Sequence, residues 1–217
     1  EALQNRLDFV RTIGNSTIIA VAYTLLSMLL CSLAGFAFAK YDFKLKEPLF
    51  YFVLLTLVLP IQALVVPLFL LISTMDLLNT FIAVILPWAA NPLGIFLMRQ
   101  NMQAIPDALL ESARMDGATE FQIFYKIALP TMIPSLAALA VILFINQWRL
   151  FLYPLVVLQE ESMFTVPIAL NQLVGAQRVA FEQIMVGSTL AIIPIALLFL
   201  FLQRYFIKGI LAGAVKQ

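Results

Sequence analysis

The sequence contains no histidine and a single cysteine, and only 12% of its 217 residues are charged. Cys31 alone cannot form a disulfide within the chain, and without histidine the usual His/Cys metal clusters and nucleophile–base pairs are excluded. The 13 basic and 12 acidic residues nearly cancel, so the charge balance indicates neither nucleic acid nor a strongly acidic partner. Chemistry on a substrate is therefore not expected of this chain.

Apolar residues dominate what is present. They make up 63% of the sequence, and the mean hydropathy is +0.99, too high for a chain of this length to cover a globule with polar surface. Five stretches are long enough to cross a hydrocarbon core, which takes about 20 helical residues. None shows the two-residue alternation of a membrane barrel, so each is predicted to be a helix. The predicted fold is an all-α integral membrane bundle, a single domain over residues 1–217, with spans at 16–39, 49–72, 81–98, 134–158 and 184–206.

Several of these spans contain proline, which removes a backbone donor and bends a helix. Kinks are expected at Pro60, Pro67, Pro87, Pro92, Pro154 and Pro194. Such bends are either packing irregularities or hinges in a bundle that must rock.

The basic residues predict the orientation, because Lys and Arg concentrate in short cytoplasmic loops. Nine of them fall on one side of the predicted spans: Lys40, Lys44, Lys46, Arg99, Arg114, Lys126, Arg204, Lys208 and Lys216. The C-terminal tail, residues 207–217, is thus predicted to be cytoplasmic, and the N-terminus and the loop 159–183 to lie outside. An outside N-terminus without a starting Met or a signal peptide predicts a sixth span ahead of residue 1 in the full-length protein.

Residues 105–130 form the one long charged, amphipathic block, and the topology places them on the cytoplasmic side. Pro106 suits a first helical turn and Gly117 a helix stop, which predicts a helix over 106–116. Thr119 and Gln122 have capping-box spacing, which predicts a second helix over 120–129. The alternative is an interfacial helix pair lying on lipid. Acidic residues outnumber basic ones in the block, however, which favours a protein socket over anionic lipid.

A known family has a similar signature in this block. Glu111-Ser112-Ala113, with Gly117 four residues after Ala113, resembles the EAA motif of ABC importer permeases, with Ser112 in place of the usual alanine. The stretch from Arg114 to Ala118 is similar to the sugar-importer version of the motif. The C-terminal segment from Gln203 resembles the end of the second permease subunit of maltose-type carbohydrate importers, so the resemblance covers essentially the whole chain. The pattern also includes Ile127, Leu129, Pro130 and Pro134.

The resemblance implies a type I (MetI-like) six-helix permease in a bacterial or archaeal cytoplasmic membrane. Its implied partners are a sister permease, a cytoplasmic ATPase dimer and an extracytoplasmic solute-binding protein, which we expect to dock on the loop 159–183. The chain lacks a phosphate-binding Gly-x4-Gly-Lys-Ser/Thr loop, so ATP and magnesium would be used by the ATPase, and no cofactor is expected here. The residues predicted to couple to the ATPase are Glu111, Ser112, Ala113, Asp116, Gly117 and Thr119, with tail contacts from Gly213, Val215 and Lys216. For Glu111 the alternative is a solvated helix charge.

The solute path is predicted from polar groups inside the spans. An ionisable group within a span usually faces the bundle interior, and amides near aromatic rings suit a sugar. These criteria select Gln62, Asn146, Gln147, Trp148, Arg149 and Tyr153. Interhelical hydrogen bonding, or snorkelling of Arg149 to the interface, are the alternatives. Related permeases commonly have Asn followed by an acidic residue after this tryptophan, whereas this chain has Arg149 and Leu150.

The sequence therefore predicts an ATP-driven permease subunit for a sugar or oligosaccharide. An ABC permease for glycerol phosphate, a polyamine or a peptide is the alternative within the same class. A secondary transporter would normally carry coupling carboxylates within the membrane, whereas all 12 acidic residues fall in loops or near span ends. An intramembrane enzyme would need a nucleophile with a base, and no such pair is evident.

Overall fold

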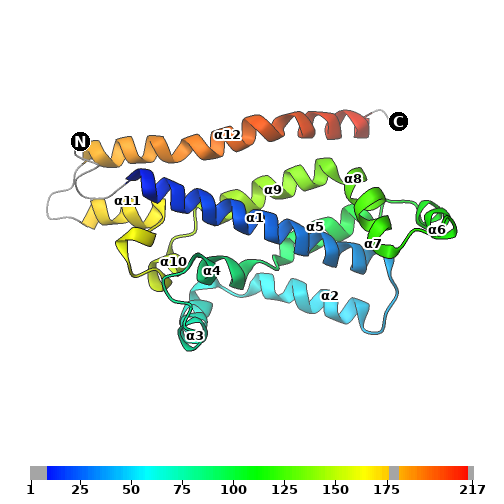
Figure 1. The fold of residues 1–217 in the computed structure, drawn as a ribbon, viewed down its shortest axis with the longest axis horizontal. Coiled ribbons are helices and arrows are strands. Elements are labelled where there is room, and N and C mark those ends of the chain that lie inside the picture. The colour runs from blue at the N-terminus through cyan, green and yellow to red at the C-terminus, as the bar shows by residue number, and fades with distance from the viewer. Residues whose placement is uncertain (1–8, 176–180, 215–217) are drawn as a thin grey trace. The chain divides into compact units, whose positions relative to one another are not determined.

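A computed structural model describes residues 9–175 and 181–214, with side chains described as far as Tyr205 (Figure 1). Every regular element within these ranges is helical, as predicted. Two helices are by themselves long and apolar enough to cross a membrane: α1 (Phe9–Lys40) and the Phe181–Tyr205 part of α12 (Phe181–Ala214). Up to five spans result if each of three broken helix pairs counts as one.

Three of the five predicted spans are divided into separate helices, a larger departure from a straight helix than the predicted kinks. The second is divided into α2 (Lys46–Leu55), a short 3-10 turn and α3 (Ile61–Thr74). The third is divided into α4 (Phe81–Ile85), a second 3-10 turn and α5 (Pro92–Met102). The fourth is divided into α9 (Ile133–Trp148) and α10 (Leu152–Val157).

Proline explains these breaks, because at three positions it starts a new helix instead of only bending one. Pro60 forces extended backbone on Leu59 (ψ 121°) and then leads into α3. Pro92 occupies the first position of α5, where Asn91 accepts a 2.9 Å hydrogen bond from Gly94 N. The break before α10 puts Pro154 in that helix's first turn, where its missing N–H costs no hydrogen bond. Pro67 and Pro194 remain inside helices.

The chain forms two compact units. The first contains Glu1–Thr24, Pro60–Ala89 and Leu143–Phe201, and the second contains Leu25–Leu59, Ala90–Ile142 and Leu202–Gln217. That residues 1–217 act as a single domain stays a prediction.

Two interior clusters stabilise the first unit by burying apolar surface. One surrounds the fully buried Tyr153 and includes Ile19, Val84 and Ile168. The other surrounds Trp148 and includes Phe9 and Phe144.

In the second unit, α1 and α5 pack at close range through glycine. A Cβ added to Gly35 would lie 2.5 Å from Met98 Cβ, and one added to Gly94 would lie 2.6 Å from Cys31 Sγ. The Cys31 thiol donates a 3.3 Å hydrogen bond to the carbonyl of Asn91. The second unit also holds the charged block 105–130.

Candidate functional site

The charged block folds as the predicted pair of helices. The first is α6 (Asp107–Met115), and Gly117 ends it with φ +83°, a left-handed conformation that glycine adopts without strain. Gly117 N donates to Arg114 O and Ala118 N to Ala113 O, each at 3.0 Å, which is the Schellman pattern of helix termination. The capping box of Thr119 and Gln122 then begins α7 (Glu120–Ile123). Both local predictions are confirmed.

The second predicted helix is less regular than expected. After α7 the chain makes a π-helical turn over Phe124–Ala128 and then a short helix, α8 (Leu129–Thr131). In a regular α-helix the ring of Pro130 would clash with the carbonyl of Lys126, and the wider π turn accommodates it. The segment Glu120–Thr131, which contains this turn, makes an angle of 81° with the helix Ile133–Trp148 that follows it.

Both helices of the block are tied to the end of α1. The Lys40 ammonium donates to Asp107 Oδ1 at 2.7 Å and to the carbonyl of Ile105 at 2.5 Å, which fixes the start of α6. The Tyr41 hydroxyl donates to Glu120 Oε2 at 2.5 Å, which fixes the start of α7. The side chain of Lys40 is only 3% exposed, so this cation is committed to its partners.

A second ion pair closes the elbow between the helices. The Arg114 guanidinium donates to both oxygens of Glu120, at 2.7 and 3.2 Å. Arg114, followed by the Tyr41 hydroxyl, lowers the pKa of the Glu120 carboxyl. Burial and then the Glu120 carboxylate raise the pKa of Tyr41 to about 12, and Lys40 lowers the pKa of Asp107. Near neutral pH, Glu120 and Asp107 are therefore ionised, and the Tyr41 hydroxyl keeps its proton.

The underside of the block is packed on aromatic rings. Leu110, Ile123 and Phe124 are buried, and the rings of Phe36 and Phe124 lie 5.4 Å apart. The Phe36 ring also meets Tyr41 edge-on at 5.6 Å. Helix α1 thus holds the block through packing as well as through its polar anchors.

The outer side of the block is exposed and mixed in character. Met115 is 83% exposed and Phe121 is 67% exposed, so the block presents apolar as well as charged side chains. Glu111 and Asp116 are also exposed and have no partner among the described residues. We call Glu111, Met115, Asp116 and Phe121 the docking face.

The predicted acidic face needs a correction. Asp107 and Glu120 are neutralised by Lys40 and Arg114, so only Glu111 and Asp116 present free negative charge. The other predicted coupling residues have structural contacts. Ser112 is exposed and its hydroxyl donates to Ala108 O at 2.8 Å, and Ala113 is half-buried.

Lys40 and Tyr41 were not predicted to anchor the block. Their position directly after an apolar span indicates only the side of the membrane on which they lie. Their partners lie 65 to 79 residues away in the sequence. Of the predicted tail contacts, Gly213 lies at the end of α12, and Val215 and Lys216 lie outside the described residues.

The predicted solute-path residues all belong to the first unit, where three of them are buried: Gln147, Trp148 and Tyr153. Trp148 is 5% exposed and stacks on Phe144, with ring centres 5.6 Å apart. Tyr153 is fully buried and its hydroxyl donates to Ala83 O at 3.0 Å.

The remaining predicted residues differ from these two in exposure or in hydrogen bonding. Gln147 is buried, and its amide nitrogen has no hydrogen-bond partner within the described residues. Arg149 and Gln62 are exposed and Asn146 is half-buried. A surface hollow of about 280 Å³ in this unit is lined by a different set, which includes a polar residue not predicted: Phe151, Pro167, Leu170, Asn171, Val174 and Ile184.

The outer loop predicted to receive a binding protein is held by amide side chains. Asn79 Oδ1 accepts from Gln159 N at 2.5 Å and from Glu160 N at 3.1 Å. Asn15 Nδ2 donates to the carbonyls of Ser162 and Phe164 at 2.9 and 3.1 Å. The described start of this loop is therefore well anchored within the first unit.

Comparison with known proteins identifies the family. The model of the "Binding-protein-dependent transport system inner membrane component" family matches residues 27–211. The chain belongs to this family. It is therefore a multi-pass membrane permease component of a transport system, which confirms the resemblance drawn from the EAA-like motif.

Two relatives show how similar the permease is to characterised systems. It is 45% identical over 203 residues to the arabinooligosaccharides transport system permease protein AraQ of Halalkalibacterium halodurans, covering 94% of this chain and 73% of that protein. It is 39% identical over 211 residues to the lactose transport system permease protein LacG of Rhizobium radiobacter, covering 97% of this chain and 77% of that protein.

Solved structures confirm the fold class of the permease. A bacterial ABC transporter involved in the import of the acidic polysaccharide alginate matches with a TM-score of 0.80 and 24% identity, over 91% of this chain and 75% of that chain. The MetNI methionine ABC transporter matches with a TM-score of 0.68 and 19% identity, over 91% of this chain and 94% of that chain. The fold is that of type I ABC importer permeases.

Proposed function

We propose that this permease is a membrane-spanning subunit of an ATP-driven importer that carries a sugar or oligosaccharide delivered by a binding protein. Its partners are a sister permease, an extracytoplasmic solute-binding protein and a cytoplasmic ATPase dimer, which binds the ATP and magnesium. The names of the relatives that transport arabinooligosaccharides and lactose support the solute class. An sn-glycerol-3-phosphate permease, UgpE of Yersinia enterocolitica, is 31% identical over 95% of this chain and makes that solute the second candidate.

The observation that carries the coupling role is the anchored block with its unpartnered docking face. The anchored helix pair leaves the apolar side chains of Met115 and Phe121 in contact with water. A partner that covered them would gain free energy by burying this apolar surface. A cleft in an ATPase subunit would bury both side chains and pair with Glu111 or Asp116. Because α6 and α7 are both tied to α1, closure of that cleft would move α1 together with them.

The distribution of charge supports a cytoplasmic docking face and a cytoplasmic C-terminus. Seven of the nine basic residues predicted to face the cytoplasm have described side chains, and all seven belong to the second unit, as does the docking face. The first unit holds the loop 159–166, which we propose as part of the binding-protein contact. Solute specificity would rest largely on that binding protein and on the sister permease.

The coupling role is tested by truncating the docking face without touching its anchors. Phe121→Ala in the assembled transporter should lower ATPase co-purification and ATP-driven uptake about thirtyfold, since a buried interface aromatic contributes about 2 kcal/mol or more. Phe43→Ala is the matched control, because Phe43 is an exposed aromatic of the same unit outside the docking face. Equal effects of the two substitutions would contradict the assignment.

The solute is tested separately, in vesicles loaded with ATP and supplied with the purified binding protein. We expect the vesicles to take up a labelled arabino-oligosaccharide and not to take up sn-glycerol 3-phosphate. The reverse preference would select the second candidate.

A further inference from the structure

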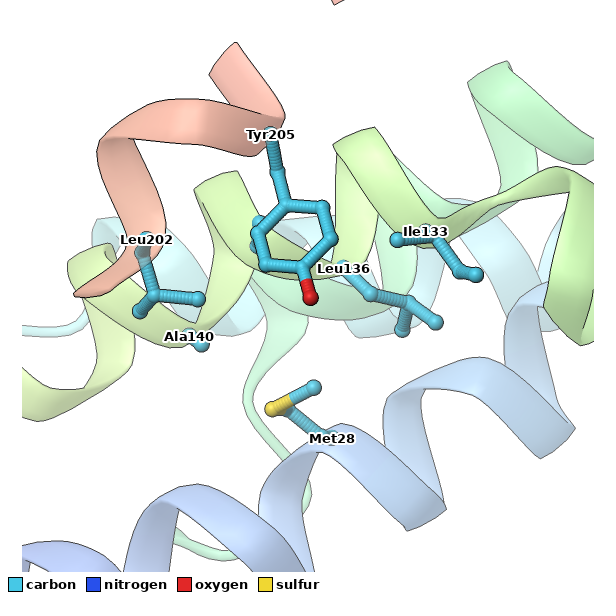
Figure 2. A pocket seen from close by; sticks show the side chains of 7 residues that line it. Met28, Ile133, Leu136, Ala140, Leu202 and Tyr205 are labelled. Atoms are coloured by element: carbon cyan, nitrogen blue, oxygen red, sulfur yellow. The ribbon is translucent and has the colours of Figure 1, made fainter. Parts of the chain in front are cut away.

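A hollow in the second unit has a lining that is almost entirely apolar. Its volume is about 190 Å³, and it is lined by Met28 of α1, Leu202 and Tyr205 of α12, and four residues of α9: Ile133, Leu136, Ala137 and Ala140. Figure 2 shows the Tyr205 ring standing over the α9 side chains, with its hydroxyl directed toward Met28. An apolar hollow is filled by an apolar group, because water there would have too few hydrogen-bond partners.

A cation without an acidic partner is bonded to Tyr205 of the lining. Arg204 is exposed, and its guanidinium donates a 3.1 Å hydrogen bond to the Tyr205 hydroxyl while lying 4.9 Å from the centre of that ring. No carboxylate forms an ion pair with Arg204 among the residues that the structure describes. In contrast, Lys40, Lys46, Arg99 and Arg114 each have one. The apolar lining and this available positive charge fit one amphipathic anion better than either a water cluster or an acidic protein segment.

Arg204 and Tyr205 lie at the end of the predicted span 184–206, four residues or fewer before Lys208. Tyrosine and arginine at a span end lie at the membrane–water interface, so the hollow lies just inside the hydrocarbon layer. Only 6% of this apolar span is buried among the described residues, which leaves most of its surface available to lipid. Cytoplasmic leaflets are rich in anionic phospholipid, and basic sites between membrane helices bind such headgroups.

We propose that this hollow is a binding site for an anionic phospholipid. Part of one acyl chain occupies the space between α1, α9 and α12, and the headgroup phosphate accepts hydrogen bonds from Arg204. The site goes beyond the transport function, although its assignment to the cytoplasmic leaflet rests on the proposed orientation.

The test uses the assembled transporter in nanodiscs made of equal parts phosphatidylglycerol and phosphatidylcholine, with retained lipid counted by native mass spectrometry. We expect phosphatidylglycerol to be retained preferentially. Arg204→Gln should lower that preference about fivefold, the effect of one interfacial cation. Arg204→Lys should keep most of it, and Lys44→Gln should not change it, since Lys44 is an exposed cation of the same unit away from the hollow.

The acyl-chain contact is tested by filling the hollow. Ala140→Leu should lower retention of both lipids, whereas Ala138→Leu, the same change on the same helix outside the lining, should not. Equal retention in these two variants, or an unchanged lipid preference in Arg204→Gln, would overturn the proposal. Loss of a second membrane chain from the Ala140→Leu complex would also overturn it, since a protein would then be the occupant. ATP-driven uptake by the unaltered transporter, measured in parallel, shows whether the proposed function itself holds.

Discussion

Substitution of Gly117 offers a sharp test of the elbow between α6 and α7. The residue has φ +83°, and a Cβ built on it meets no atom within 4 Å, so steric exclusion contributes nothing. Gly117→Ala should therefore destabilise the elbow only through the strain of placing an L-residue in the left-handed region, about 1–2 kcal/mol. That free energy corresponds to a factor of about 5–30 in the population of the closed elbow.

The effect should be local, because Asp107 and Glu120 still anchor the two helices to α1. The amide of Ala118, which bonds to Ala113 O across the elbow, should lose protection from hydrogen exchange by the same factor. Gly117→Asn should have a smaller effect because asparagine tolerates this conformation, and Gly117→Val should have a larger one. ATPase co-purification and ATP-driven uptake should decline in the same order.

Gly14→Ala is the matched control. Gly14 lies in α1 with open space around a built Cβ and without positive φ, so alanine should stabilise that helix by up to about 1 kcal/mol. If Gly117→Ala leaves Ala118 exchange unchanged while Gly117→Val does not, the cost is steric and the elbow argument is wrong. If exchange rises but ATPase binding does not fall, the elbow is unrelated to docking.

Three further substitutions test other contacts. Lys40→Met removes the donor to the buried carbonyl of Ile105 and should destabilise the start of α6 by about 1–3 kcal/mol, measured by hydrogen exchange. Gly94→Ala should lower thermal stability by about 1–3 kcal/mol because its Cβ would lie 2.6 Å from Cys31 Sγ, and adding Cys31→Ala should restore it. Glu120→Gln should be less stable than the unaltered protein above pH 4.5, the ordinary carboxyl pKa, because the native pKa is lower. The difference should shrink as the pH falls through that native pKa; a constant difference down to pH 3 would contradict the ion-pair argument.

The parts of the site that the sequence predicted well depend on signals within a few residues. Pro106, Gly117 and the Thr119–Gln122 pair each act on their own turn, so the helix ends follow from local chemistry. The π turn was missed because it depends on how Pro130 meets a carbonyl four residues earlier. Periodicity alone does not distinguish a kink from a wider turn.

The pairing of residues distant in the sequence leaves no local pattern from which it could be predicted. The carboxylates Asp107 and Glu120 look as free as Glu111 in a linear sequence, but the fold brings Lys40 and Tyr41 to them. Similarly, Trp148 and Tyr153 combine apolar bulk with a polar group, which suits a solute path or a protein interior equally. The structure places both side chains in the interior, because each packs against aromatic or aliphatic residues distant in sequence.

Side chains near both ends of helix α1 hold other parts of the chain. It runs without a break over 32 residues, about 48 Å at the rise of an α-helix, whereas three other predicted spans are broken near proline. Near its start, Asn15 holds the carbonyls of Ser162 and Phe164 in the loop proposed to contact the binding protein. At its end, Lys40 and Tyr41 hold the helices behind the docking face. A broken span absorbs motion at its break, while an unbroken helix transmits it along its axis, so the proposed coupling would follow α1.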